Sequence, residues 1–426
     1  MCGSARGFAI PRALRQTRGM IRRALTNTGW LMGARGINAV LSLGYLALAT
    51  RALGLEGFGQ FILVTAFAQA IAGLFSFQTW QAVVRWGQRR ETVGDAIGFA
   101  LALDLLTVLA GSAAAALLLG LAGDWLPVAP DLRGEAFALT VVWLLAIRST
   151  PTGILRLHDR YAKGAAADSV TSIVRIAGSL AAALFAPTIP AFVLAWAVGE
   201  VVTAAVYWRF ALQLEPLSPC RISLVRLPRA EPGAWGFVWG TGLSGVLLVA
   251  SRQLVVLLVG ALGGAALAGI YRVAAQLGEG LLKLAQALLR ATYPELVRDP
   301  DKARHIAARI GKIALFTGVA TVAIGVLAGH WLIVLVAGPE YAAAYLPMLV
   351  LAAAAAVELA GATFDALLVA RGHALRNFML RAVPTVLAVA ALPLVVPAGG
   401  APGAAAAILA ASVLTVAGLL WANRAR

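Results

Sequence analysis

Apolar segments long enough to cross a membrane follow one another along almost the whole chain, with short polar connections between them. A membrane-spanning helix needs about 20 predominantly apolar residues. This pattern predicts an all-α polytopic membrane protein with about twelve transmembrane helices. The predicted helices are Thr28–Ala49, Phe61–Val84, Ala96–Leu121, Phe137–Leu155, Ser169–Ala186, Ala191–Leu212, Phe237–Val259, Ala268–Ala291, Ile313–Val336, Tyr345–Val369, Met379–Val396 and Ala404–Trp421.

Basic residues gather in every second connection between these segments. The first basic connection holds Arg85, Arg89 and Arg90, and the connections that alternate with the basic ones are short and weakly charged, such as Pro187–Pro190. Cytoplasmic loops of membrane proteins collect lysine and arginine. The alternation therefore predicts that the basic connections and both termini are cytoplasmic, in the inner membrane of a bacterium. It also requires an even number of crossings.

The composition agrees with a chain that lies mostly in lipid. Hydrophobic residues make up 61% of it and charged residues 13%, with a mean hydropathy of +0.85. Soluble domains carry roughly twice that charged fraction. The net charge of +16 follows from the basic connections, so no nucleic-acid partner is predicted. Isolated histidines and two distant cysteines, Cys2 and Cys220, predict neither a metal site nor a disulfide.

An arginine-rich segment, residues 1–27, precedes the first predicted helix. We expect it to be a cytoplasmic lead that orients this helix, because arginine stays on the cytoplasmic side of a membrane. An organellar transit peptide would also be rich in arginine, but it would be rich in serine, which is scarce here.

The eighth predicted helix carries polar residues along one face. They step by four, three, four, three and four positions, which is the spacing of one stripe on an α-helix. A charge at the centre of a bilayer costs ~2.5–3.5 kcal/mol on insertion scales, so we expect the stripe to face a central polar cavity inside the bundle. Its members are Arg272, Gln276, Glu279, Lys283, Gln286 and Arg290.

Two roles fit this stripe. Its cations would bind a pyrophosphate group in the cavity, because arginine and lysine suit that charge. Alternatively, the stripe neutralises itself, because Glu279 lies one helical turn before Lys283, which is a favourable order for an ion pair. Arg290 lies nearer the cytoplasmic end, where its guanidinium can reach water.

Further charged and polar residues lie inside other predicted helices. Arg35 and Asn38 begin a second stripe in the first helix, and Arg252 lies in the middle of the seventh. We expect these three to line the same cavity. Arg148 and Arg175 lie closer to the cytoplasmic ends of their helices, so they are expected to be interfacial anchors.

Carboxylates within the predicted spans have two interpretations. Each would carry the proton or Na⁺ that drives transport, or would pair with a neighbouring arginine for structure. The sequence leaves both open. We expect no other cofactor, and direct use of ATP is not predicted because the phosphate-binding motif with its Lys-Ser/Thr is missing from the sequence. The carboxylates are Asp104, Glu200, Glu358 and Asp365, together with Glu279 of the stripe.

The two halves of the chain resemble each other weakly. Gly54 and Gly59, which follow the first predicted helix, recur as Gly263 and Gly269 after the seventh. Two copies of one unit in the same orientation imply lobes related by an axis along the membrane normal. We therefore predict two six-helix lobes, and a proline-bearing cytoplasmic linker between them. The lobes span residues 28–212 and 235–423, and the linker spans 213–234.

Three short motifs carry a family resemblance. They are 51–61 (RALGLEGFGQF), Gly269-Ile-Tyr271 with the run to Tyr293-Pro-Glu-Leu296, and Gly338-Pro-Glu-Tyr341. Each resembles the corresponding turn or helix of the polysaccharide flippases in the multidrug/oligosaccharidyl-lipid/polysaccharide (MOP) exporter superfamily.

That resemblance implies a transporter rather than an enzyme. It would flip a polyprenyl-pyrophosphate-linked oligosaccharide, a repeat unit of polysaccharide or O-antigen, by alternating access. Its partners would be this substrate, membrane lipids and other polysaccharide assembly proteins.

Two other functions are weighed against this one. A cation-coupled multidrug exporter of the same superfamily would need a site of carboxylates and aromatics, whereas the stripe is mainly basic. A membrane-embedded polysaccharide polymerase or ligase would need catalytic loops on the outer face. The outer connections are short, and the longest, Gly123–Glu135, offers a few acids and Arg133.

The charge alternation generates a topological prediction. Reporter fusions placed after Arg90, Lys163, Arg226 and Arg304 should all report a cytoplasmic location, because each of these fusion points lies in a basic connection. Activity of a periplasmic reporter at any of these positions would rule out the twelve-helix arrangement.

Overall fold

The structure is a computed structural model that describes residues 12–296, 303–370 and 373–424, and all regular elements in these ranges are helical. The apolar segments form helices because a backbone in lipid must satisfy its own hydrogen bonds. The helices are α1 (Arg12–Leu74), α2 (Trp80–Trp86), α3 (Val93–Leu121), α4 (Arg133–Leu145), α5 (Ser149–Leu157), α6 (Tyr161–Phe185), α7 (Ile189–Leu212), α8 (Arg226–Ala230), α9 (Ala234–Leu296), α10 (Ala303–Val336), α11 (Tyr345–Ala370) and α12 (Ala374–Arg424).

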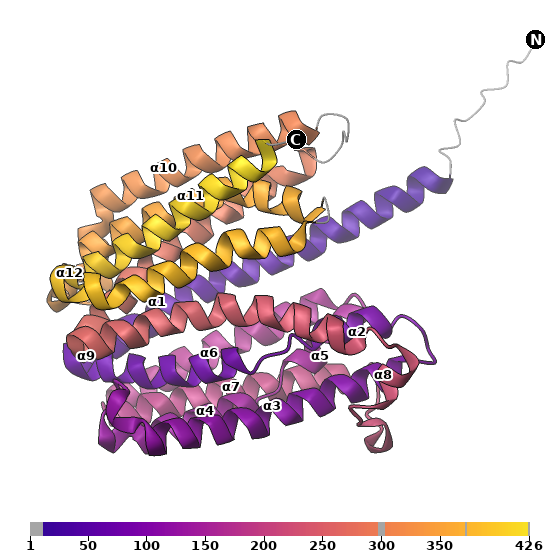
Figure 1. Cartoon of the computed structure of the whole chain (residues 1–426), viewed down its shortest axis with the longest axis horizontal. Helices are drawn as coiled ribbons and strands as arrows, with labels where there is room; N and C mark the ends of the chain where they lie inside the picture. Colours follow the sequence, from indigo (N-terminus) through magenta and orange to yellow (C-terminus); the bar gives the residue numbers. More distant parts are fainter. Residues whose placement is uncertain (1–11, 297–302, 371–372, 425–426) are drawn as a thin grey trace, which may run out of the picture.

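Three of these elements are hairpins rather than single helices. α1, α9 and α12 each contain one glycine outside helical geometry, with positive φ at Gly54 (68°), Gly264 (83°) and Gly400 (56°). Glycine adopts this conformation at no steric cost, so one residue suffices to reverse the chain. Figure 1 shows each of the three running out and back. The described residues contain nine apolar spans, three of which hold such a reversal, so the prediction of twelve crossings is confirmed.

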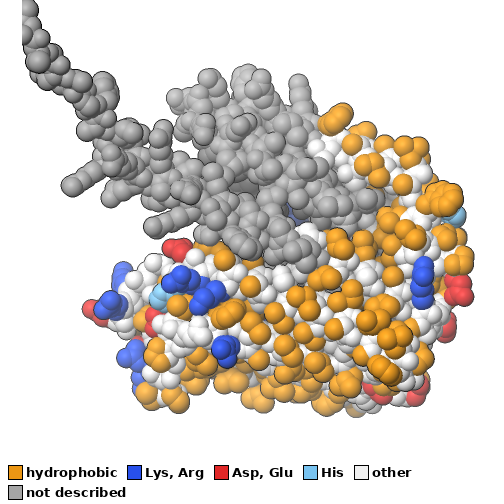
Figure 2. Space-filling model, turned by 180° about the vertical axis from the view of Figure 1, so that it is seen from behind, with side chains coloured by type: hydrophobic (Ala, Val, Ile, Leu, Met, Phe, Trp, Pro, Cys, Tyr) orange, Lys and Arg blue, Asp and Glu red, His pale blue; other side chains and the backbone are white. Residues whose placement is uncertain are grey.

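α1 and α9 lie in the middle of the bundle. α10, α11 and α12 pack against α9 on one side, while α4, α6 and α7 pack against α1 on the other (Figure 1). The exterior carries large exposed apolar side chains such as Leu109, Leu184 and Leu327. Figure 2 shows this apolar surface as a broad band with the charged side chains at its two ends. Such a surface identifies a multi-pass membrane protein.

The hairpins are fastened to one another at their reversal end. A Cβ atom on Gly59 of α1 would overlap the carbonyl oxygen of Ala265 in α9, and one on Gly269 would lie 3.3 Å from the Cα of Gly59. The two backbones therefore touch, which small residues allow between membrane helices. Tyr341, next to the start of α11, donates a hydrogen bond of 3.1 Å to the carbonyl oxygen of Gly54.

These glycines also refine the internal repeat. Gly54 and Gly264 adopt the same turn, and their separation equals that of Gly59 and Gly269. The predicted pairing of Gly54 with Gly263 was therefore wrong by one residue. Equivalent glycines of the two halves, Gly59 and Gly269, contact each other. The division into lobes 28–212 and 235–423 stays a prediction.

Two predicted helices are broken, which corrects the continuous spans Phe61–Val84 and Phe137–Leu155. The first ends at Leu74 and resumes at α2, and the second is interrupted between α4 and α5. At the second break, Pro151 has no N–H to donate to the carbonyl of Ile147, four residues earlier. The indole Nε1 of Trp208 donates to that carbonyl instead, at 2.9 Å.

Asp104 of α3 joins the two breaks. Its buried carboxylate accepts hydrogen bonds from the hydroxyls of Thr79 (2.8 Å) and Thr150 (2.6 Å) and from the backbone N–H of Thr150 (3.3 Å). Thr79 precedes α2, and Thr150 lies in the first turn of α5. A carboxylate at a helix N-terminus is stabilised by the unpaired N–H groups there. Asp104 is thus a structural group between two half-helices.

The predicted linker 213–234 is packed against α2 and α3. Leu227 is fully buried, and the segment ends in an aromatic ladder at the start of α9. The ladder consists of three edge-to-face pairs, Trp235–Phe99, Phe237–Trp86 and Trp239–Phe77, with ring centroids 5.3, 5.2 and 4.9 Å apart. The first half of α9 is therefore fixed to the N-terminal half of the chain at this end.

The glycine contact between α1 and α9 can be tested by adding one methyl group. Gly59→Ala should lower the free energy of unfolding by ~1–3 kcal/mol, because the methyl group meets backbone that cannot move aside easily. Thermal unfolding of the purified protein in detergent measures this effect. The matched control is Gly120→Ala in α3, where an added Cβ meets nothing within 4 Å. Equal stability of the two variants would contradict the contact.

Candidate functional site

Polar side chains of α1 and α9 meet between the two hairpins, in what we call the polar seam: Ser42, Gln69, Arg252, Gln253, Gln276 and Glu279. The amide nitrogen of Gln253 donates to the amide oxygen of Gln69 at 2.8 Å. Gln276 donates to the carbonyl oxygen of Ser42 at 3.5 Å. The seam thus joins both halves of the chain through groups that hydrogen-bond.

An ion pair within the seam joins the two arms of α9. Nη1 of Arg252 lies 3.5 Å from Oε2 of Glu279, and the side chains are 57% and 37% exposed. The sequence predicted Lys283 as the partner of Glu279. Lys283, Gln286 and Arg290 belong to α9, but their side chains lie outside the described residues. A long and partly exposed pair is weak, so a ligand can compete for either partner.

The other predicted cavity residues lie near this seam along the chain. Arg272 is half-buried in α9, two turns before Glu279. Asn38 lies one turn before Ser42 in α1, and its amide oxygen is buried without a hydrogen-bond partner among the described residues. Arg35 belongs to the same helix, but its side chain lies outside the description. The cavity predicted from the whole stripe stays a prediction.

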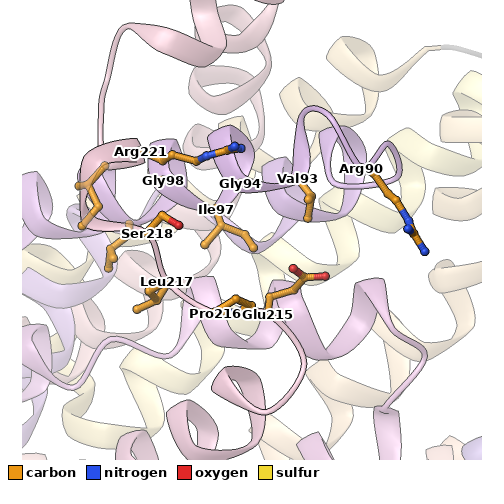
Figure 3. A pocket seen from close by; sticks show the side chains of 12 residues that line it. Arg90, Val93, Gly94, Ile97, Gly98, Glu215, Pro216, Leu217, Ser218 and Arg221 are labelled. Atoms are coloured by element: carbon orange, nitrogen blue, oxygen red, sulfur yellow. The ribbon is translucent and has the colours of Figure 1, made fainter.

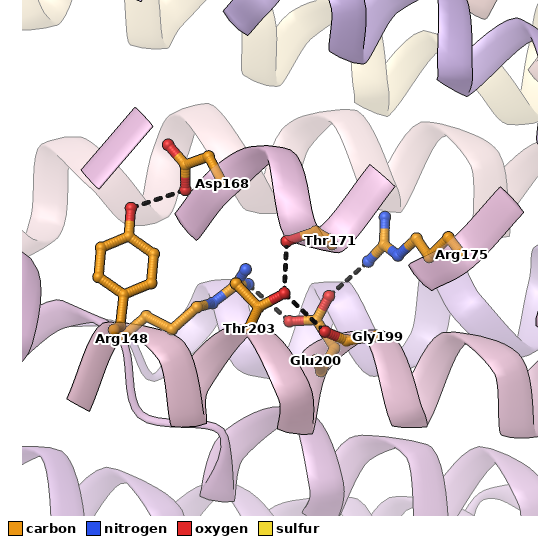
Figure 4. Close-up of polar contacts among 8 residues, drawn as sticks. Arg148, Asp168, Thr171, Arg175, Gly199, Glu200 and Thr203 are labelled. Atoms are coloured by element: carbon orange, nitrogen blue, oxygen red, sulfur yellow. Dashed lines mark hydrogen bonds and ion pairs between the residues drawn. The ribbon is translucent and has the colours of Figure 1, made fainter. Parts of the chain in front are cut away.

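A second charged group, the Glu200 cluster of Arg148, Arg175 and Glu200, lies among α5, α6 and α7 (Figure 4). Glu200 is 0% exposed, and its Oε2 lies 2.6 Å from Nη2 of Arg148, which precedes α5. Its other oxygen accepts a hydrogen bond from Arg175. Two guanidiniums against one carboxylate give the cluster a net charge of about +1 when all three are ionised.

This cluster corrects the prediction that Arg148 and Arg175 are interfacial anchors. Both guanidiniums point inward because the buried carboxylate needs cationic partners within the bundle. The guanidinium of Arg175 also stacks on Trp196, 3.8 Å from the ring centroid. Sequence reasoning missed the pairing because the three residues come from separate helices.

The Glu200 cluster is connected to the polar seam through α1. The ring of Tyr45 contacts that of Trp196 edge-to-face, with centroids 5.7 Å apart. Tyr45 lies one helical turn beyond Ser42, whose carbonyl belongs to the seam. The two groups are therefore separated by a single turn of α1.

The remaining predicted carboxylates are engaged elsewhere. Glu358 of α11 accepts a hydrogen bond of 2.9 Å from Ser412 in α12. Asp365 of α11 lies 3.1 Å from Arg381 in α12. Within the described ranges, His, Cys, Asp and Glu form no group of three that could hold a metal ion.

The fold is that of the MOP-superfamily transporters. The lipid II flippase MurJ matches with a TM-score of 0.73 and 11% identity, over 91% of this chain and 86% of its own. An inward-facing multidrug resistance MATE family transporter matches with a TM-score of 0.63 and 17% identity, over 93% of this chain and 94% of its own. A MOP-superfamily transporter from Pyrococcus furiosus with a binding pocket of reverse polarity matches with a TM-score of 0.61 and 17% identity, over 95% of each chain.

Sequence comparison identifies the family. Residues 24–300 match the family of polysaccharide biosynthesis proteins. Inner membrane protein YghQ of Escherichia coli (strain K12) is 30% identical over 345 residues, which cover 77% of this chain and 96% of that protein. The chain belongs to this polysaccharide biosynthesis protein family, so the predicted resemblance is confirmed.

The Glu200 cluster predicts a large effect of one isosteric change. Glu200→Gln leaves two facing guanidiniums without a counter-charge, and breaking a buried pair typically costs about 3–5 kcal/mol. We expect a clear fall in the midpoint of thermal unfolding in detergent, partly restored when Arg148→Gln is added. The control is Glu358→Gln, because the amide oxygen still accepts the hydrogen bond from Ser412. A Glu200→Gln protein as stable as this control would refute the structural pairing.

Proposed function

We propose that this protein is a flippase that moves a polyprenyl-pyrophosphate-linked oligosaccharide across the bacterial inner membrane by alternating access. Membership of a polysaccharide biosynthesis family and the MOP fold support the class of protein. The observation that carries the substrate is the polar seam, where the partly exposed Arg252 lies beside hydrogen-bonding amides. A pyrophosphate needs such cations, and an oligosaccharide needs such amides.

The proposed roles follow from the chemistry of these side chains. Arg252, Arg272 and Lys283 bind the pyrophosphate, since guanidinium and ammonium groups donate several hydrogen bonds to phosphate oxygens. Gln253 and Gln276 bind sugar hydroxyl groups, because each amide both donates and accepts. The polyprenyl tail stays in the lipid outside the bundle, where its burial costs nothing.

The two kinds of contact between α1 and α9 support a rocking motion. At the reversal end the backbones touch through glycines, and this contact has little freedom to change. Along the seam the contacts are hydrogen bonds and a weak ion pair, which a polar ligand can replace. The halves of the chain would therefore pivot near Gly59 and Gly269. Exposure of the seam to the cytoplasm would also require the aromatic ladder at the start of α9 to separate or to move with the N-terminal half. The basic connections and both termini lie on that side in this proposal.

The multidrug alternative has less support. A cationic drug would need an unpaired carboxylate in the seam, yet Glu279 lies beside Arg252 and most of the other side chains of the seam are amides. The partial exposure of Glu279 and its contact with Arg252 support a role for this carboxylate in ion coupling. We assign it, rather than the buried Glu200, as the group that would exchange a proton or Na⁺ during the cycle.

Removal of Arg252 in the seam, or of Arg272 near it, should abolish export. Arg252→Ala and Arg272→Ala should each remove most surface polysaccharide from cells, because the pyrophosphate loses its charge-assisted hydrogen bonds. Surface polysaccharide is measured against the amount of protein in the membrane. Arg272→Lys should restore activity only partly, since lysine lacks the planar guanidinium fork. The control is Arg209→Ala at the exposed end of α7. Normal polysaccharide in both alanine variants would contradict the assignment.

A further inference from the structure

A cavity of about 240 Å³ lies away from the polar seam, at the end of the bundle that carries the basic connections. It is bounded by the first turns of α3 and by the segment 215–222, which leaves α7 toward α8 (Figure 3). Apolar side chains form one part of its wall, and polar ones form the other. The apolar part includes Ile97, Leu101 and Leu217; the polar part consists of Arg90, Glu215, Ser218 and Arg221.

Glycines of α3 let the segment 215–222 approach this closely. A Cβ on Gly98 would overlap the carbonyl oxygen of Arg221, and one on Gly94 would lie 2.8 Å from the Cδ of that arginine. The side chain of Arg221 therefore extends along the first turns of α3, and its Nη1 lies 3.9 Å from Asp95. The guanidinium thus lies against the backbone of α3 on one side, and its side chain is 43% exposed, so it can contact a ligand.

The stripe of α3 that bounds the cavity leads along the helix to a lipid-facing surface. Gly94, Gly98 and Leu101 lie on one stripe of α3, with steps of four and three, and the same spacing leads on to Leu105 and Leu109. These two leucines are 42% and 70% exposed. In a membrane they contact acyl chains, so a lipid whose chain follows this stripe would place its head group in the cavity.

The charges around the cavity have both signs. Arg90 and Arg221 suit a phosphate, and the hydroxyl of Ser218 can donate to it. Figure 3 shows the carboxylate of Glu215 pointing into the space between them. Oε1 of Glu215 lies 2.9 Å from Nε2 of His158, which leaves its other oxygen to accept from an ammonium group. A purely anionic head group would meet this carboxylate, whereas a zwitterion satisfies both signs.

We propose that this cavity binds the phosphoethanolamine head group of a membrane phospholipid. The phosphate contacts Arg90 and Arg221, and the ammonium group contacts Glu215. The volume supports a head group rather than a whole ligand, since sites for drug-sized molecules measure about 300–1,000 Å³. Basic pockets at the cytoplasmic ends of membrane helices are known to hold lipid head groups. This site is separate from the polar seam, so it stands or falls independently of the proposed substrate.

Lipid binding to the purified full-length protein tests the proposal. Native mass spectrometry would compare short-chain phosphatidylethanolamine, phosphatidylglycerol and phosphatidylcholine with free phosphoethanolamine. We expect phosphatidylethanolamine to bind best, because the trimethylammonium of phosphatidylcholine donates no N–H and phosphatidylglycerol has no ammonium. The variant Arg90→Gln with Arg221→Gln should bind it at least about tenfold more weakly, as expected for lost charge-assisted hydrogen bonds. Arg209→Gln, at the same end of the bundle, should bind it normally.

Two further variants separate the parts of the site. Glu215→Gln should change the preference from phosphatidylethanolamine to phosphatidylglycerol, because it removes the negative charge that attracts the ammonium group and repels an anionic head group. Ser218→Trp should block binding by filling the cavity, and Ser218 is exposed, so the fold should tolerate the change.

Three results would overturn the proposal: equal binding of all three lipids, unchanged binding by the double arginine variant, or free phosphoethanolamine binding as tightly as the lipid. The last would show a site for a soluble phosphate rather than for a membrane lipid.

Discussion

The direct contact between the backbones of α1 and α9 sets the arrangement of the other helices. It exists because Gly59 and Gly269 have no side chains, and because Gly54 and Gly264 reverse the chain within a single residue. In lipid the hydrophobic effect does not drive helices together, so close packing of small residues must do so. With α1 and α9 held at one end, α10–α12 pack on one side and α3–α7 on the other. The same contact brings the polar side chains of α1 and α9 together, and these side chains form the polar seam.

Charges inside this bundle are of two kinds. Asp104 and Glu200 are buried, and each is surrounded by donors that hold broken or neighbouring helices in place. Arg252 and Glu279 are partly exposed, and their pair is long. A buried charge that loses its partner destabilises the fold, whereas an exposed pair can exchange partners at little cost. The carboxylates therefore differ in burial and in the strength of their contacts, although all of them looked alike in the sequence.

The sequence predicted the helices well and their contacts poorly. Long apolar runs define spans and a single glycine reverses them, so the number of crossings could be counted. The breaks at Phe75 and Ala146 were not predicted, because the few polar residues at each lie between long apolar runs and do not lower the hydropathy of a whole span. Pro151, with Ser149 and Thr150 before it, is a helix-start signal that was overlooked. The first break has no such signal, since Gln78 takes a positive φ of 51° without a glycine.

Ion pairs were harder to predict for a geometrical reason. Glu279 and Lys283 are close in sequence, so spacing alone can propose that pair, which stays a prediction because the side chain of Lys283 lies outside the described residues. Arg252 reaches Glu279 only because α9 folds back at Gly264. Glu200 likewise collects its arginines from two other elements. Spacing along one helix predicts which residues share a face, and the partner of that face depends on the packing of the bundle.

The proposed function requires that the protein itself moves an anionic, lipid-linked oligosaccharide across a bilayer. The direct measurement reconstitutes the purified protein into liposomes that carry a polyprenyl-pyrophosphate oligosaccharide, and follows the fraction of sugar that becomes accessible to an impermeant glycosidase. If the protein is such a flippase, the fraction of accessible sugar rises to include the inner-leaflet pool. In empty liposomes that inner-leaflet pool stays protected. Protection identical to that in empty liposomes, with transport of a cationic drug by the same preparation, would contradict it.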